Sequence, residues 1–367
     1  MKYKAIICFS TAMLGLAPAW SQQNLGNVTL YGLLDEGVEH VHGVSLGNGK
    51  SGSDYRVGAG TAASRWGLRG SEDLGGGLQA VFTLEGGISV DTGAQGQGRL
   101  FGRQAWVGLA GDFGTVTIGR QYAMRYYALL DADIFGAGAQ GLGSIDPGIP
   151  NARIDNAIAY RGKLGAFSGG VNYSVGRDTV NTSSVAGSNC PGETSDSKQC
   201  REWSAMAKYD GGNWGVVSGY EKQYGGTAAT YGGLTAPDKT DSRLTVNAYY
   251  QKEQARFGAG WLKRINEGIA TPKSDLYWLA GAVPVYGAFV IDGMVAQLKY
   301  RDSPNGARLY ALRADYLLSK RTMLYLGAAF VNNSGALAIA ATTNPPATAP
   351  LPGGSQQSIF TGVKHTF

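Results

Sequence analysis

Histidine is scarce in this sequence. The 367 residues include three histidines, His40, His42 and His365, and none of them lies in a nucleophile motif. Because covalent hydrolytic catalysis needs an organised nucleophile and base, the sequence predicts no enzyme. His40 and His42 would share one face of a strand without an evident third ligand, so we expect neither a metal site nor a cofactor.

Long hydrophobic runs are also scarce. One run, residues 5–16, follows the basic residues Lys2 and Lys4 and precedes small residues at 17, 19 and 21. Its length suits the roughly 7–15 residues of a signal-peptide core and falls short of the roughly 20 residues of a spanning helix. We therefore predict a cleaved signal peptide over 1–21, with a membrane anchor as the disfavoured alternative. An exported chain without another such run is periplasmic, secreted, or an outer-membrane barrel.

Charge and cysteine content restrict the partners. Charged residues make up 16% of the chain, and its net charge of +5 is too mild to indicate nucleic acid. Of three cysteines, Cys8 leaves with the signal, and Cys190 and Cys200 remain in a polar stretch. An even number of cysteines in an oxidising compartment predicts a disulfide that closes a loop. A metal pair is disfavoured because no histidine lies nearby.

Glycine and tyrosine are abundant, with 57 and 20 residues, and many segments alternate in polarity. In 241–252, Leu244 and Val246 share one side, and Arg243 and Asn247 share the other. A period of two is that of a β-strand. The predicted strands are 27–41, 61–71, 77–88, 99–110, 113–121, 154–162, 166–176, 201–210, 213–224, 241–252, 254–265, 273–283, 288–300, 307–318, 321–333 and 356–367.

The connections between these segments alternate in length. Short turns are expected at 70–76, 111–112, 162–165, 211–212, 253, 284–287 and 319–320. Long polar loops are expected at 42–60, 89–98, 122–153, 177–200, 225–240 and 334–355, with modest ones at 266–272 and 301–306. Short turns on one rim and long loops on the other are typical of outer-membrane barrels. We predict an all-β, transmembrane, antiparallel barrel of sixteen strands over 22–367, with both termini at the short-turn rim.

A soluble β-sandwich would also alternate, and aromatic residues near the predicted strand ends favour the barrel. The predicted aromatic girdles contain Trp66, Trp214, Tyr220, Tyr250, Tyr300 and Phe367. Two segments depart from the pattern. Glu36 falls on the lipid-facing side of the first strand, which indicates a bulge, a rim position or a subunit contact. In 288–300 the two faces cannot be told apart.

Several long motifs occur in order along the chain. They are Asn27–Asp35, Ser64–Ala80, Phe101–Leu109, Gly114–Tyr122 and Gly362–Phe367. Through them the sequence resembles the Gram-negative general porins of the neisserial and beta-proteobacterial branch. The resemblance implies a homotrimer of sixteen-stranded barrels in outer-membrane lipid and lipopolysaccharide, and passive diffusion of small hydrophilic solutes and ions.

The resemblance also implies that the third loop, 122–153, folds into the barrel and narrows it. This loop carries Asp131, Asp133 and Asp146, and Ile134 stands where the family often has proline. Residues 136–141 match the GxGxxG pattern. A phosphate site would need a βαβ unit, which is not visible here, so we interpret the glycines as part of a flexible loop.

Charged residues on the predicted inner wall would filter ions, because fixed charges act strongly in a narrow passage. Arg65 and Arg69 oppose outward residues by simple alternation, as does Glu85. The inward placement of Arg103 and Arg120, which sit in twin Gly-Arg-Gln motifs, rests on the resemblance. For each arginine a rim or headgroup contact is the alternative.

The resulting hypothesis is a constriction that sets Arg65, Arg103 and Arg153 against Glu85, Asp131 and Asp133, with mild anion preference. A substrate-selective channel is the alternative, which the many tyrosines leave open, and adhesion through the loops could coexist with either function.

Overall fold

The computed structural model describes residues 27–136, 138–146, 148–149, 152–177, 190, 192–227, 233–346 and 348–367. The signal peptide predicted over 1–21 lies outside the described residues, so that boundary stays a prediction.

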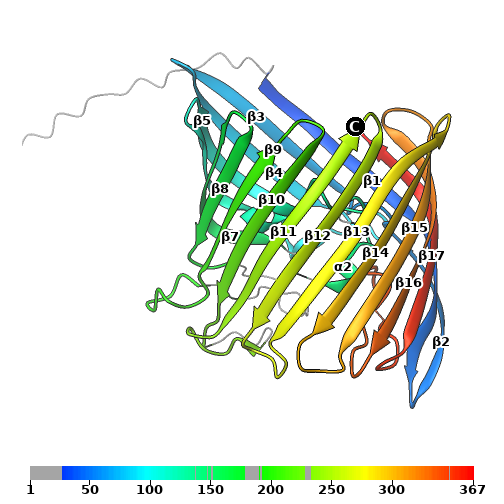
Figure 1. Cartoon of the computed structure of the whole chain (residues 1–367). Coiled ribbons are helices and arrows are strands. Elements are labelled where there is room, and N and C mark those ends of the chain that lie inside the picture. The colour runs from blue at the N-terminus through cyan, green and yellow to red at the C-terminus, as the bar shows by residue number, and fades with distance from the viewer. Residues whose placement is uncertain are drawn as a thin grey trace, which may run out of the picture.

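The described chain forms one closed antiparallel β-barrel (Figure 1). On one edge, β1 (Val28–Gly47) pairs first with β3 (Arg65–Gly75) and then with β2 (Lys50–Gly58). On its other edge β1 pairs with β17 (Ser355–Thr366), which closes the cylinder. Because β2 and β3 share one edge of β1, the seventeen described strands make a wall of sixteen, as predicted.

The other strands follow one another around the wall in chain order. They are β4 (Leu78–Gly87), β5 (Gln104–Gly111), β6 (Gly114–Tyr122), β7 (Arg153–Leu164), β8 (Phe167–Ser174), β9 (Glu202–Asp210), β10 (Trp214–Tyr224), β11 (Thr240–Lys252), β12 (Ala255–Asn266), β13 (Lys273–Tyr286), β14 (Phe289–Tyr300), β15 (Gly306–Leu317) and β16 (Thr322–Ser334). Short turns gather at one rim, where the C-terminus lies, and longer loops at the other (Figure 1). Among the described residues, no helix is both long and apolar enough to cross a membrane.

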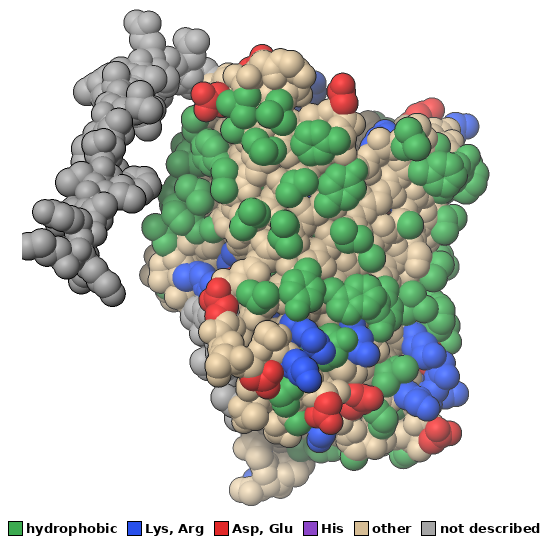
Figure 2. All heavy atoms as spheres, turned by 90° about the vertical axis from the view of Figure 1, so that its left-hand side faces the viewer, with side chains coloured by type: hydrophobic (Ala, Val, Ile, Leu, Met, Phe, Trp, Pro, Cys, Tyr) green, Lys and Arg blue, Asp and Glu red, His purple; other side chains and the backbone are tan. Residues whose placement is uncertain are grey.

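The alternation of side chains along each strand decides which of them face the lumen and which face outward. In β11, Val246 and Tyr250 are exposed on the outer wall, whereas Arg243, Thr245 and Asn247 are buried in the lumen. The faces predicted for 241–252 are therefore confirmed. A period of two places every second side chain on the same side, so the hydrophobic positions become an apolar outer band (Figure 2).

The predictions for residues 42–60 and for Tyr300 need correction. The stretch 42–60, predicted as a loop, continues β1 to Gly47 and returns as β2, so it is mostly a hairpin. Tyr300, predicted as part of an aromatic girdle, packs against the hydrophobic cluster inside the barrel. The register explains the second error, since Lys299 pairs outward with Gly306 and its neighbour must point inward.

The lumen beside β12–β16 holds a hydrophobic core. Inward side chains such as Leu276, Trp278, Met294 and Leu309 are almost fully buried there. The sequence left the faces of 288–300 unassigned, and the reason is that β13 and β14 are largely apolar on both faces. In β14, Met294 and Ala296 point inward while Val295 points outward. Apolar residues of the third loop cover this wall, which keeps that side of the lumen dry.

Buried Asp35 of β1 ties three distant segments together. Its carboxylate accepts hydrogen bonds from the backbone N–H groups of Gly60, Thr61 and Ala62, and from the hydroxyl of Tyr325 at 2.7 Å. A carboxylate can be buried when several donors replace its hydration. The cluster explains why β3 begins at Arg65 rather than at the predicted residue 61.

Candidate functional site

The third loop crosses the inside of the barrel. The loop predicted over 122–153 runs from Ala123 to Ala152 and contains two short helices, α1 (Met124–Leu129) and α2 (Leu142–Ile145). Helix α1 lies against the inner faces of β8–β11, and Ala139 reaches across to bond with Gly60 beside β3. We call residues 123–152 loop 3.

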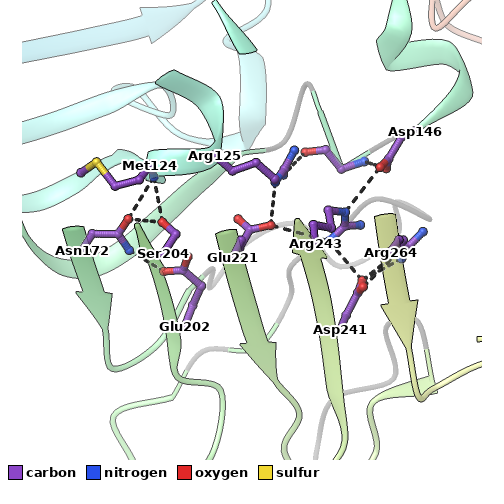
Figure 3. A network of polar contacts seen from close by, with 11 residues as sticks. Met124, Arg125, Asp146, Asn172, Glu202, Ser204, Glu221, Asp241, Arg243 and Arg264 are labelled. Carbon is purple, nitrogen blue, oxygen red and sulfur yellow. Dashed lines mark hydrogen bonds and ion pairs between the residues drawn. The ribbon is translucent and has the colours of Figure 1, made fainter. Parts of the chain in front are cut away.

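The barrel wall caps the first helix of loop 3 (Figure 3). The backbone N–H of Met124 donates to Asn172 Oδ1 at 3.0 Å and to Ser204 Oγ at 2.8 Å. At the other end, Asn247 Nδ2 donates to the Ala128 carbonyl at 2.8 Å. The helix has no side-chain cap of its own, so the wall satisfies groups that a helix terminus leaves unpaired.

A chain of buried ion pairs fixes loop 3 to β10–β12 (Figure 3). Arg125 Nε lies 2.7 Å from Glu221 Oε2, and Arg125 Nη2 also donates to the Gly148 carbonyl. Arg243 contacts Glu221 at 3.6 Å, Asp146 at 3.4 Å and Asp241 at 3.2 Å. We call these residues, with Arg264, the loop 3 anchor.

Burial alone would raise the pKa of Asp146, but the guanidinium groups of Arg243, Arg264 and Arg125 hold that pKa well below its ordinary value. The loop carboxylate is therefore ionised and anchors the loop electrostatically. Sequence reasoning noted Asp146 and placed Arg243 on a polar face, but it did not connect them, because nothing in the sequence pairs residues so far apart.

The tip of loop 3 touches β9 and β12, which flank two of the strands that hold its first helix. Asp131 Oδ2 lies 2.9 Å from Lys208 Nζ on β9, and Asp131 does not reach the arginines that were predicted to oppose it. The backbone of Ala132 approaches Gly258 of β12 so closely that a Cβ on this glycine would overlap the Ala132 carbonyl. Glycine at 258 thus permits the contact.

We expect the substitution Gly258→Ala to displace the tip of loop 3. Forcing a methyl group into a filled space costs about 1–3 kcal/mol, so the thermal unfolding midpoint in detergent should fall. Gly293→Ala is the matched control, because its methyl group would meet no atom nearer than 4.0 Å. Equal midpoints for the two variants would contradict this close contact.

Beside loop 3 lies a cavity of about 620 Å³. One side carries Arg65, Arg103 and Arg153 together with Tyr122 and Tyr126. The Tyr122 hydroxyl accepts hydrogen bonds from Arg103 at 2.8 Å and from Arg153 at 3.4 Å. The two tyrosine rings stack with their centroids 3.8 Å apart. This packing holds two guanidinium groups beside the cavity.

Glu85 lies just behind the arginine side of the cavity. Its carboxylate contacts Arg103 Nε at 2.7 Å and Arg65 Nε at 3.6 Å, and it accepts a hydrogen bond from the Tyr31 hydroxyl. One carboxylate therefore pairs with two guanidinium groups, which leaves an excess of positive charge on the arginine side of the cavity.

The rest of the cavity lining is mixed. Leu130, half exposed, and Leu317 present apolar surface, and Asp133 borders the same space. Arg313 forms ion pairs with Asp292 and with Asp315, the second at 2.9 Å. In total the charged lining consists of Arg65, Arg103, Arg153, Arg256, Arg313 and Lys364 against Asp133, Asp292 and Asp315.

Two predicted arginines lie away from this cavity. Arg69 faces the lumen, with its guanidinium carbon 5.2 Å from the centre of the Tyr31 ring. Arg120 forms a buried pair with Asp155 at 2.6 Å, and Asp155 also binds Arg99. The β6–β7 register shifts between Gly119 and Gln121. Such a bulge redirects a side chain, so simple alternation along β6 does not place Arg120.

The remaining sequence signals have structural roles. Cys190 and Cys200 form the predicted disulfide. His40 stacks on Tyr55 of β2, and His42 shares a hydrogen bond with Ser53. Within the described ranges, no group of three or more His, Cys, Asp or Glu side chains is placed to hold a metal ion.

Comparisons with known proteins agree on one family. The profile described as "Gram-negative porin" matches residues 10–336. Outer membrane porin protein 32 of Delftia acidovorans is 30% identical, over 97% of this chain and 98% of that protein. The major outer membrane protein P.IB of Neisseria gonorrhoeae is 38% identical over 118 residues, which is 32% of this chain and 31% of that protein. The solved anion-selective porin from Comamonas acidovorans is 28% identical, covers 93% of this chain and 99% of its own, and has a TM-score of 0.75.

Proposed function

Because the chain belongs to the Gram-negative porins and is therefore a general diffusion channel of the outer membrane, we propose that its pore prefers anions mildly and narrows at the cavity beside loop 3. The basic excess of the cavity lining carries this proposal. Six lining side chains are basic and three are acidic, and Glu85 behind them is shared by two arginines.

Charge acts strongly at this point because the passage is narrow. Loop 3 and the core along β12–β16 occupy part of the lumen, so ions pass close to the fixed charges. At an effective dielectric constant of about 20, two unit charges 4 Å apart interact by about 4 kcal/mol. The carboxylates that border the cavity reduce the field, and they keep the expected preference mild. The name of the Comamonas acidovorans relative, an anion-selective porin, supports the same preference.

The constriction would consist of Arg65, Arg103 and Arg153 against Asp133, with Glu85 in support. Asp131 would act only as a partner of Lys208, and Arg69 and Arg120 would lie outside the narrowest part. Of the eight predicted constriction residues, five would therefore belong to the constriction and three would lie away from it.

We also propose a homotrimer. Glu36 points outward from β1, and β1 pairs with β17 from Leu33 to His42 without a register shift, so no bulge turns this carboxylate inward. A carboxylate facing lipid is costly, whereas a neighbouring subunit could shield it. One solved structure with the same fold, OmpT of Vibrio cholerae, is described in a trimer form. Native mass spectrometry in detergent would measure the assembly.

The reversal potential in a KCl gradient across a planar bilayer tests the ion preference. We expect a potential whose sign shows that chloride permeates somewhat faster than potassium, and whose size falls at high salt as the fixed charges are screened. A potential of the opposite sign would overturn the proposed selectivity.

A further inference from the structure

The two sides of the cavity beside loop 3 differ in their chemistry. Arg65 and Arg153 begin β3 and β7, and Arg103 directly precedes β5. The rest of the lining comes mainly from loop 3 and from β12–β17, and we call it the loop 3 side. In a wall of sixteen strands β5 and β13 lie half a turn apart. A solute in the cavity therefore meets the arginines and the loop 3 side together.

Charge on the loop 3 side is balanced. Three basic and three acidic side chains line it, namely Arg256, Arg313, Lys364, Asp133, Asp292 and Asp315. Arg313 pairs there with Asp292 and with Asp315. On the arginine side, by contrast, Arg65 and Arg103 share one carboxylate, that of Glu85. The net positive charge of the cavity therefore lies on the arginine side.

Apolar side chains on the loop 3 side are open to the cavity. Leu130 of loop 3 is 50% exposed and Leu317 of β15 is 39% exposed, and both line the cavity. Val290 of β14 lines it too, and it packs against the hydrophobic cluster inside the barrel. Apolar surface in contact with water is unfavourable. Passage of hydrophilic solutes alone gives no reason for two leucines to be exposed at the same cavity.

The pairing register directs these side chains inward. Val290 pairs with Asp315, and Leu317 pairs with Met323. Because Arg313, Asp315 and Leu317 are alternate residues of β15, they share one face of the strand. The leucine therefore faces the lumen with the charged residues of the cavity, and the lipid does not cover it.

The combination of the two sides resembles a small-molecule site. Such sites are cavities of roughly 300–1,000 Å³, largely apolar, in which a few polar groups fix the orientation of the ligand. The present cavity measures about 620 Å³. Arg65 is the most exposed of its three arginines, with 28% of the side chain accessible against 4% for Arg103. A guanidinium group binds a carboxylate through charge-assisted hydrogen bonds.

We propose that the cavity transiently binds monocarboxylates with a short apolar body, which place the carboxylate at Arg65 and the apolar body against Leu130 and Leu317. This inference rests on the proposed anion preference and adds a second requirement, which is apolar surface on the solute. Conduction requires that a bound solute can leave again, so the expected dissociation constant is about millimolar.

Block of the chloride current by hexanoate and by gluconate tests the proposal. Both anions are monocarboxylates of equal carbon number, but gluconate carries hydroxyl groups along its chain. Single channels of the purified protein are recorded in KCl while the potassium salt of either acid is added. We expect the concentration that halves the current to be about tenfold lower for hexanoate, which equals about 1.4 kcal/mol and corresponds to burial of about two methylene groups.

Three variants locate the effect. The double substitution Leu130→Asn, Leu317→Asn should reduce the difference between the two acids to less than about threefold, because the apolar body loses its contact surface. The substitutions Leu130→Met, Leu317→Met keep that surface apolar and should retain the difference, which separates loss of apolarity from misfolding. Leu46→Asn is the matched control, because Leu46 is 65% exposed near the turn between β1 and β2 and lies outside the cavity lining (Figure 1).

Equal block of the wild-type current by hexanoate and gluconate would overturn this inference. So would an unchanged difference in the asparagine variant, which would place the effect at another site or in the lipid bilayer. The reversal potential in KCl without either acid reports the anion preference separately. A wild-type channel that prefers chloride but does not distinguish the two acids therefore refutes the binding of apolar carboxylates and leaves the anion preference standing.

Discussion

The double substitution Arg65→Gln and Arg153→Gln is expected to abolish the anion preference of the pore. Both side chains border the cavity beside loop 3, and Arg65 is more exposed than its neighbour Arg103. Removing about 1.4 kcal/mol of Coulomb attraction for a passing anion corresponds to a tenfold change in partition. A tenfold change exceeds a mild preference, so we expect the ratio of chloride to potassium permeability to fall from above one to one or below, measured as the reversal potential in a KCl gradient.

Position should matter more than total charge in this experiment. The variant Lys252→Gln, Lys320→Gln removes the same charge near the short-turn rim, where screening by salt is strong, and it should keep the wild-type potential. Arg103 is left unchanged because its buried pair with Glu85 also supports the wall. An unaltered potential in the double variant would show that the narrowest point lies elsewhere along the lumen.

The substitution Glu221→Leu is expected to release loop 3 from the wall and lower stability by about 3–5 kcal/mol. Glu221 is almost completely buried between Arg125 and Arg243, so its removal leaves two buried guanidinium groups without this partner. Denaturant unfolding in detergent micelles measures the loss, and larger fluctuations of single-channel current would report the loosened loop.

Two matched variants allow the loss of stability in Glu221→Leu to be compared with the loss of other ion pairs. Arg125→Met should cost less than Glu221→Leu, because Glu221 keeps its contact with Arg243 at 3.6 Å. Lys208→Gln breaks the more exposed pair with Asp131 and should cost about 0–1 kcal/mol. Similar losses for Glu221→Leu and Lys208→Gln would argue against the loop 3 anchor as the main attachment of the loop.

The loop 3 anchor and the cavity contain two different sets of charged residues. In the loop 3 anchor, opposite charges are buried together and hold the loop in place. Basic residues exceed acidic ones in the lining of the cavity. Polar residues inside a barrel can therefore be structural or functional, and the balance of charge around each one distinguishes the two.

Local patterning was enough to locate most of the strands and to assign the faces of several of them. A period of two places every second residue on the same side of a strand whatever its surroundings, so the faces of 241–252 could be assigned without a structure. Loop lengths then ordered the strands into sixteen neighbours with two distinct rims. The inward direction of Arg65, Arg69 and Glu85 followed from the same local rule.

Tertiary structure alone decided where the rule fails and which charges meet. The bulge at Gly119–Gln121 directs Arg120 to Asp155, and one extra residue in a strand reverses every later side chain. The inner faces of β13 and β14 can be apolar because loop 3 covers them, and a strand pattern alone does not show that cover. Arg125 and Glu221 are 96 residues apart, and an ion pair depends on distance in space, which a linear pattern does not contain.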